Sequence, residues 1–179
     1  MVMFTVFSSL QCEAATEYFV RPSEIDPTSC NVGICLTFTE YLNEADHFFQ
    51  SNTSFLFMPG THYMNKTLDI SSVSNILFLG LKESPQILAN ISCKKGGTCI
   101  AFRINYATNV TFKQLQFNLE LSRDSSGVKR MNAFSSAFVS FLKFESVDIN
   151  VTIISESKPR LGYAVNLYSC TSVNIFTSL

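Results

Sequence analysis

Apolar and polar residues alternate along most of this chain from about residue 55 onward. The segment 71–80, SSVSNILFLG, ends in an alternating apolar run, and the segment 106–115, YATNVTFKQL, follows the same pattern. A period of two is typical of β-strands with one buried face, whereas helical repeats show a spacing of 3.6 residues. The pattern therefore predicts strands and disfavours helical solenoids.

The alternating segments also repeat. A similar phrase occurs at 144–153, FESVDINVTI, and at 170–179, CTSVNIFTSL. Aligning the four copies gives one polar column, which consists of Asn75, Asn109, Asp148 and Asn174. The copies are 34, 39 and 26 residues apart, within the range of stacked structural repeats. Strand repeats of this length predict a parallel β-helix, in which equal positions of successive coils lie above one another.

The polar column has two interpretations. Stacked amides at a corner can form a ladder of hydrogen bonds from coil to coil, as in cross-β assemblies. Alternatively, these residues only provide the left-handed backbone geometry of a turn. The same alignment sets Asp69 against Arg103 as a surface ion pair. It also predicts an apolar core column of Leu68, Phe102, Phe141 and Leu167.

Residues 37–50, TFTEYLNEADHFFQ, have a different period. Their apolar side chains recur at helical spacing, and Thr37 with Glu40 forms a capping box at the start. We therefore expect an amphipathic helix over about 37–50. Because the exposed end of a β-helix needs a cover, we interpret residues 15–54 as an N-terminal cap and residues 55–179 as the coils.

The N-terminal residues and the sequons indicate a secreted protein. Residues 1–14 combine an apolar stretch with small residues, which predicts a signal peptide, with a first strand as the alternative. Five Asn-x-Ser/Thr sequons occur, at Asn52, Asn65, Asn90, Asn109 and Asn150. We expect glycans on Asn52, Asn65 and Asn150, and none on Asn109 if the ladder faces inward.

The cysteines agree with an oxidising compartment. The close spacings in CNVGIC and CKKGGTC predict two loop-closing disulfides, Cys30–Cys35 and Cys93–Cys99. Zinc is the alternative, but these spacings differ from the C-x2-C knuckle and the chain has only two histidines. We interpret Cys170, in an apolar strand, as a small buried residue.

Composition narrows the partners. The 179 residues are 46% apolar and 15% charged, which is enough to fill one core and predicts a single ordered domain. The formal net charge is −1 and no long basic run occurs, so we expect no nucleic-acid partner. We also expect no cofactor, no metal and no membrane span within the chain.

The segments EYFVRPSE (17–24) and 30–80, followed by the repeated corner phrases, resemble the extracellular right-handed β-helix proteins that are multiplied in some early-branching animals. The resemblance is close over about residues 17–115 and weaker beyond. It implies a secreted or surface-exposed parallel β-helix, related in fold to pectate lyases, and brings no assigned activity. A complete member would continue beyond Leu179, so we expect the C-terminal end of the β-helix to be incomplete.

The residues do not assemble a recognisable catalytic set. Polysaccharide hydrolysis needs two nearby carboxylates, and lyase chemistry needs carboxylates for Ca²⁺ with a basic residue. Glu145 and Asp148 flank one corner without a third partner, and His62 in PGTHY is interpreted as a polar turn residue. The sequence therefore favours a non-catalytic module that binds a glycan or an extracellular protein.

The sequence also leaves one alternative function open and predicts an open strand edge near the C-terminus. The alternative function is a polysaccharide lyase or glycoside hydrolase whose catalytic coils lie beyond Leu179. The apolar strand at about 164–176 is expected to have an open edge, which predicts self-association of the chain.

Overall fold

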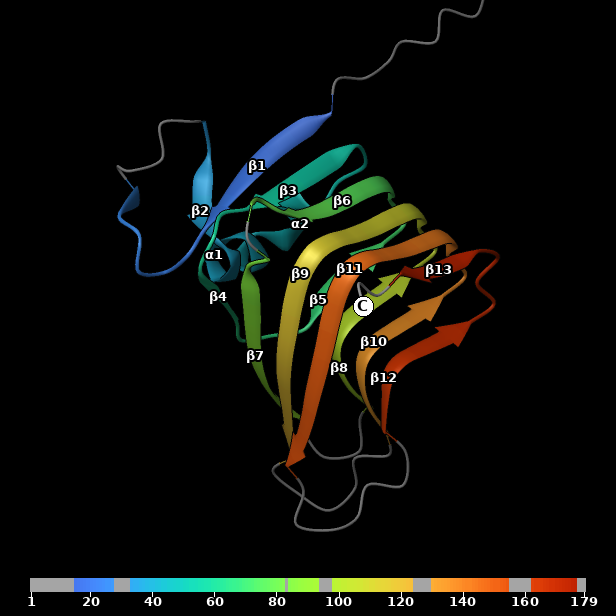
Figure 1. The fold of residues 1–179 in the computed structure, drawn as a ribbon. Helices are drawn as coiled ribbons and strands as arrows, with labels where there is room; N and C mark the ends of the chain where they lie inside the picture. Colours follow the sequence, from blue (N-terminus) through green and yellow to red (C-terminus); the bar gives the residue numbers. More distant parts are fainter. Residues whose placement is uncertain are drawn as a thin grey trace, which may run out of the picture.

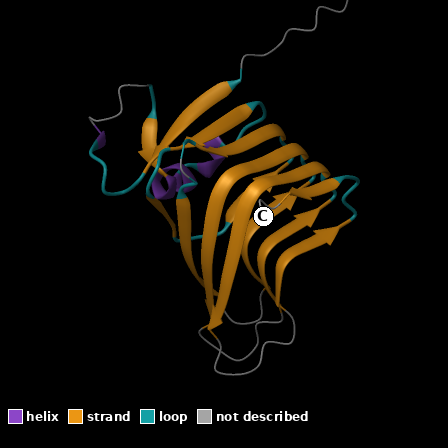
Figure 2. Cartoon of the chain, in the orientation of Figure 1, coloured by secondary structure: helices purple, strands orange, loops and turns teal. Residues whose placement is uncertain are grey.

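Strands dominate the computed structural model, which describes residues 15–27, 33–82, 84–93, 98–123, 130–154 and 162–176 (Figures 1 and 2). The N-terminal part contains β1 (Thr16–Arg21), β2 (Cys35–Thr37), α1 (Phe38–Asn43), α2 (Ala45–Phe48), β3 (Thr53–Phe57), β4 (Thr61–Met64) and β5 (Leu68–Ser71). It is followed by β6 (Ser74–Gly80), β7 (Gln86–Cys93), β8 (Thr98–Asn105) and β9 (Thr108–Arg123). The last strands are β10 (Arg130–Ala137), β11 (Ser140–Ile154), β12 (Gly162–Tyr168) and β13 (Val173–Phe176).

All pairings between the described strands are parallel, and they form two sheets. The larger sheet has the order β13-β11-β9-β6-β3-β1-β2, with β4 and β7 continuing it beside the second half of β9. The smaller sheet has the order β12-β10-β8-β5. Successive coils lie side by side, and the two sheets curve around one core in a nearly closed arrangement (Figure 1). The expectation of an all-β, parallel, solenoid-like fold is confirmed at this level.

The core contains a column of aromatic rings that crosses the larger sheet. Phe78 stacks on Phe55 at 5.3 Å and on Phe112 at 4.7 Å, and Phe112 stacks on Phe144 at 5.2 Å, as measured between ring centroids. These residues are directly paired from strand to strand, which is why their rings lie nearly parallel. Each such pair adds about 0.5–1.5 kcal/mol beyond its area burial.

The predicted apolar column is half correct. Leu68 pairs with Phe102 as expected, but Phe102 pairs next with Phe134 rather than with Phe141. Val165, not Leu167, continues the column beyond Phe134. The predicted members Phe141 and Leu167 therefore lie seven and two residues after the residues that occupy the column, Phe134 and Val165.

The displacement of seven residues in the third copy is caused by a bend inside a strand. The phrase FESVDINVTI lies within β11, where Ser146 has a left-handed φ of 53° and bends the strand without ending it. Gln114 makes the same bend in β9, also with φ of 53°. The phrase therefore marks a bend within one strand in β11 and a corner between strands elsewhere. Alternation alone does not distinguish the two.

The expected helix over 37–50 is present as two short helices. The capping box at Thr37 and Glu40 is confirmed, but the helix is interrupted at Glu44, where φ is −117° and ψ is 39°. Phe38 packs edge-on against Phe57 in β3, with ring centroids 5.2 Å apart. A simple helical cap is not supported, because β1 and β2 continue the larger sheet beyond β3.

The predicted disulfides are only partly visible. Cys35 and Cys99 are disulfide-bonded. Their predicted partners, Cys30 and the side chain of Cys93, lie outside the described residues. The pairing of these four cysteines therefore stays a prediction. Among the described cysteines Cys170 is free, and it is half-buried against the core rather than fully buried. The signal peptide expected at 1–14 also lies outside the described residues.

Each coil turns at corners where single residues have left-handed backbone geometry. Asn52, Asn75 and Asn109 occupy one corner in successive coils, with φ of 61°, 58° and 56°. The next coil places Phe141 there, with φ of 62°. Asparagine tolerates this region well, whereas it costs an ordinary L-residue about 1–2 kcal/mol. Phe141 is therefore strained, and the residue is 59% exposed, so packing offsets little of that strain.

We predict that Phe141→Asn stabilises the protein. The asparagine relieves the backbone strain and can donate to Oδ1 of Asn109, which together should raise the free energy of unfolding by about 1 kcal/mol. Urea denaturation measures the difference. The matched control is Phe141→Ala, which removes the ring but supplies no amide, and equal stability of the two variants would contradict the prediction.

Candidate functional site

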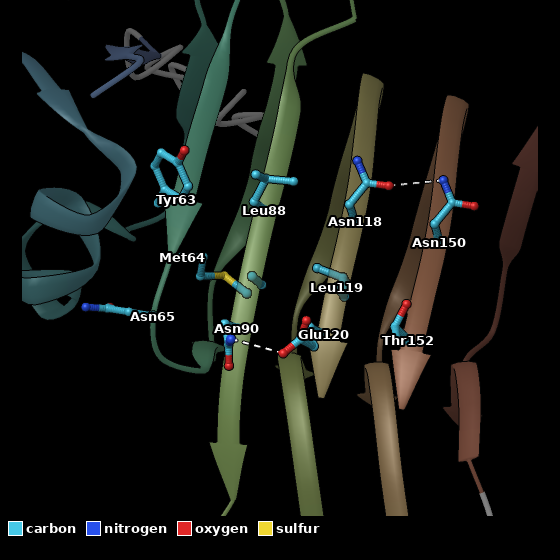
Figure 3. Close-up of a pocket in the computed structure, with 11 residues that line it drawn as sticks. Tyr63, Met64, Asn65, Leu88, Asn90, Asn118, Leu119, Glu120, Asn150 and Thr152 are labelled. Carbon is cyan, nitrogen blue, oxygen red and sulfur yellow. Dashed lines mark hydrogen bonds between the residues drawn. The ribbon is translucent and has the colours of Figure 1, made fainter. Parts of the chain in front are cut away.

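A groove with a volume of about 460 Å³ lies over β4, β7 and the second halves of β9 and β11 (Figure 3). We call it the amide groove because most of its polar lining consists of asparagine side chains. It is lined by Tyr63, Met64, Asn65, Leu88, Ala89, Asn90, Asn118, Leu119, Glu120, Asn150 and Thr152. Apart from Asn65, which directly follows β4, these residues come from four strands that are separate in sequence, so the groove depends on the register of the coils.

The strand alternation sorts the lining into rows. Side chains at every second position point away from the core, so that equal positions on neighbouring strands form rows across the sheet. One row consists of Tyr63, Leu88, Asn118 and Asn150, which are paired in that order. The next row contains Asn90, Glu120 and Thr152. The intervening residues Met64, Ala89 and Leu119 are buried and form the apolar floor.

Hydrogen bonds hold the polar rows in place. Asn150 Nδ2 donates to Asn118 Oδ1 at 3.1 Å, and Asn90 Nδ2 donates to Glu120 Oε1 at 3.1 Å (Figure 3). An amide has two N–H donors and an acceptor oxygen, so each of these asparagines keeps further hydrogen-bonding capacity. The groove therefore presents pre-positioned donors and acceptors to a ligand.

An aromatic ring lies at one side of the groove. Tyr63 is half-exposed, and its backbone carbonyl accepts a hydrogen bond of 2.8 Å from the hydroxyl of Thr39 in α1. This contact ties the backbone at the end of β4 to the helix. Tyr63 and its neighbour Leu88 supply apolar surface beside the polar rows (Figure 3).

The predicted corner ladder exists, but with other members. Asn109 Nδ2 donates to Asn75 Oδ1 at 2.9 Å, and Asn75 Nδ2 donates to Asn52 Oδ1 at 2.8 Å. Asn52 was missed because the sequence alignment began one coil too late. Asp148 and Asn174 were assigned wrongly, because Asp148 pairs with Gln116 and Asn174 pairs with Lys143.

The ladder faces outward rather than inward. Asn75 and Asn109 are exposed, so the argument that excluded a glycan from Asn109 does not hold. Two of the five sequon asparagines, Asn52 and Asn109, belong to the ladder, and the other three, Asn65, Asn90 and Asn150, all line the amide groove. The sequons were thus a sequence signal for the groove, although only the coil register shows that they share one surface.

Two carboxylates outside the groove that the sequence analysis considered, Asp69 and Glu145, are paired with cations. Arg103 contacts Asp69 at 2.8 Å, which confirms the expected surface ion pair. Glu145 lies between Lys113 and Lys143, and hydrogen bonds from these lysines lower its pKa to about 2. No cluster of three or more histidine, cysteine, aspartate or glutamate residues able to hold a metal ion occurs in the part of the chain that the structure describes.

His62 is a core residue, and its interpretation as a polar turn residue was wrong. Its side chain is buried, Nε2–H donates to Met58 O at 2.8 Å, and the ring packs edge-on against Phe57. The PGTHY turn ends before His62, which is the second residue of β4 and points inward. Burial lowers the pKa of His62, and Nδ1 has no hydrogen-bond partner among the residues that the structure describes.

We predict an acid-sensitive step in stability that depends on His62. The folded protein keeps this ring neutral, whereas the unfolded chain takes up a proton below its ordinary pKa of about 6.5. Stability is therefore complete above that pH and is lost as the pH falls below it. Urea denaturation at about pH 7.5 and about pH 5 should show a smaller loss for His62→Gln than for the wild type.

The control for this experiment is Glu145→Gln. The low pKa of Glu145 contributes stability that is present above its ordinary pKa and is lost as the pH falls toward 2. Glu145→Gln should therefore retain the loss between about pH 7.5 and pH 5 and change only the more acidic range. A loss unaltered by His62→Gln would assign the step to another group.

Comparisons with known proteins return no match. No protein-family model, no curated protein and no solved structure is significantly similar to this chain. The structure also contains no helix, within the described ranges, that is long and apolar enough to span a membrane.

Proposed function

We propose that this chain is a non-catalytic, extracellular right-handed β-helix module that binds glycans through the amide groove. The observation that carries the proposal is the set of outward rows of amide and carboxylate side chains beside the half-exposed ring of Tyr63. The coil-to-coil parallel pairing and the sequence resemblance support the β-helix class. The sequons support an extracellular location.

Glycan chemistry matches the lining. Sugar hydroxyls both donate and accept hydrogen bonds, as do the amides of Asn90, Asn118 and Asn150 when Asn90 and Asn150 carry no attached glycan. The carboxylate of Glu120 accepts hydrogen bonds that are stronger than those to neutral groups. The C–H faces of a pyranose can pack on Tyr63 and on the apolar floor, and ligand sites commonly combine such apolar surface with a few placed polar groups.

The positions of the carboxylates support a binding rather than a catalytic role. Asp148 pairs with Gln116, which lies four residues before Glu120 on β9. Four residues of strand span roughly 13 Å, which exceeds the spacing of about 5–10 Å between the two carboxylates of a glycosidase. Asp69 and Glu145 are already paired with cations.

We predict that Tyr63 contributes directly to glycan affinity. Titration calorimetry with neutral oligosaccharides selected on a glycan array should show binding that Tyr63→Ala weakens about two- to tenfold, because aromatic stacking is worth about 0.5–1.5 kcal/mol. The control is Tyr106→Ala, since Tyr106 is also exposed but stacks on Phe138 outside the groove.

The enzyme alternative has a direct test. The chain is incubated with uronic-acid polymers and with neutral polysaccharides, with and without Ca²⁺. Turnover that is lost on Asp69→Ala, or on Glu120→Gln, would replace the binding proposal with a catalytic one.

The fold also favours self-association of the chain through the last strands of its two described sheets. The strands β12 and β13 are the last members of the two described sheets, and Ile175 is 56% exposed although its paired neighbour Phe144 is buried. An apolar position beside an unpaired strand edge is a template for further pairing. The partner would be another copy of the chain, bound along β12 and β13.

We predict that Ile175→Lys reduces this self-association, because a charge at an edge opposes strand pairing. Sedimentation velocity over a concentration series should show larger species for the wild type than for the variant. Thr111→Lys, in the interior of the same sheet, is the control for a general effect of charge. A wild type that stays monomeric at all concentrations would contradict the prediction.

A further inference from the structure

Glu120 is the one carboxylate among the residues that line the amide groove. It is half-buried and lines the amide groove, whereas Asp69 and Glu145 lie outside the groove beside basic side chains. Among the residues that the structure describes, its one polar contact is the hydrogen bond from Asn90 Nδ2 at 3.1 Å. No lysine or arginine pairs with it among the described side chains.

The groove is otherwise uncharged. Its remaining polar lining consists of amides and two hydroxyl groups, on Tyr63 and Thr152. Asp148, with its exposed side chain, lies on the same face, one row beyond the lining, and it carries the same sign of charge. Among the residues that line the groove, the one charge is therefore the negative charge of Glu120.

A carboxylate retains unused acceptor sites when only one amide binds it, since two oxygens offer about four lone-pair positions. Charged groups are best stabilised by hydrogen bonds to a group of opposite charge. A ligand that brings an ammonium group would complete the surroundings of Glu120. A ligand that brings another carboxylate or a sulfate would be repelled.

We propose that Glu120 makes the amide groove selective for amine-bearing sugars, of the glucosamine class, and selects against uronic acids. This inference rests on the proposed glycan binding and assigns its substrate class. The sugar amine lies against the free oxygen of Glu120. The ring hydroxyls meet the amides of Asn118 and Asn150, and an apolar ring face lies toward Tyr63.

The experiment compares three tetrasaccharides in titration calorimetry, at low salt and at a pH where the amine is charged. The probes are a glucosamine tetramer, an N-acetylglucosamine tetramer and a galacturonic acid tetramer. The wild type should bind the glucosamine tetramer about two- to fivefold more tightly than the acetylated one, as expected for a partly exposed ion pair. The galacturonic acid tetramer should bind most weakly.

Two variants separate a local from a general charge effect. Glu120→Gln keeps an acceptor for Asn90 and should abolish the preference for the amine while retaining affinity for the acetylated tetramer. Glu145→Gln removes the same charge outside the groove and should keep the wild-type preference. Added salt should reduce the preference only where Glu120 is present.

The outcomes distinguish a failure of the proposed glycan binding from a failure of the assigned substrate class. If the wild type binds none of the three probes, the glycan proposal fails. If it binds them with equal affinity, or binds the galacturonic acid tetramer most tightly, only the assigned substrate class fails. A preference that survives in Glu120→Gln would also overturn the role of this residue.

Discussion

Parallel backbone pairing from coil to coil is the constraint on which the rest of this structure depends. Because the register is kept, each residue lies roughly 4.8 Å from its equivalents in the neighbouring coils. One position therefore repeats its chemistry along the molecule. This repetition produces the stacked rings of Phe78 and Phe112, the amide ladder of Asn75 and Asn109, and the rows that line the groove.

The corners are where this constraint is most demanding. A coil returns to its starting register only if the chain turns at defined points, and here single residues with left-handed φ make the turns. Gln114 and Ser146 occupy equivalent bends within β9 and β11, and Tyr106 and Phe138 occupy equivalent corners between strands. These residue types are strained in that region, so backbone pairing on both sides of the corner must hold them there.

A bend inside a strand also needs a close approach between coils. A Cβ atom on Gly80, the last residue of β6, would lie 1.9 Å from the carbonyl oxygen of Gln114, where β9 bends. No side chain fits at that distance. The glycine therefore permits β9 to continue around the bend as one long strand.

Local signals in the sequence predicted the elements well. Alternation identified the strands, and the capping box located the start of α1, because both depend on residues close together in the chain. Register was less predictable, since coils of different length place similar phrases at corners and at bends within strands. Asp148 was misassigned for this reason, and His62 because a turn motif obscured its inward position in β4.

The groove was not predictable as a site, because its lining comes from four strands that only the coil register brings together. Asn65, Asn90 and Asn150 were recognised as sequons, but nothing local showed that they face one another across one surface. The position of Glu120 in this lining was missed for the same reason. Its neighbour Asn90 is thirty residues away along the chain.

Because those three sequons line the groove, the host cell in which the chain is produced affects the chemistry of this surface. In a bacterial cytoplasm, which lacks the eukaryotic glycosylation machinery, the chain would present bare amides along the groove. If the chain passes through a eukaryotic secretory pathway, a sugar attached at Asn65, Asn90 or Asn150 would stand in the space that a ligand would enter. Preparations from the two kinds of host are then different molecules at this surface, even with the same sequence.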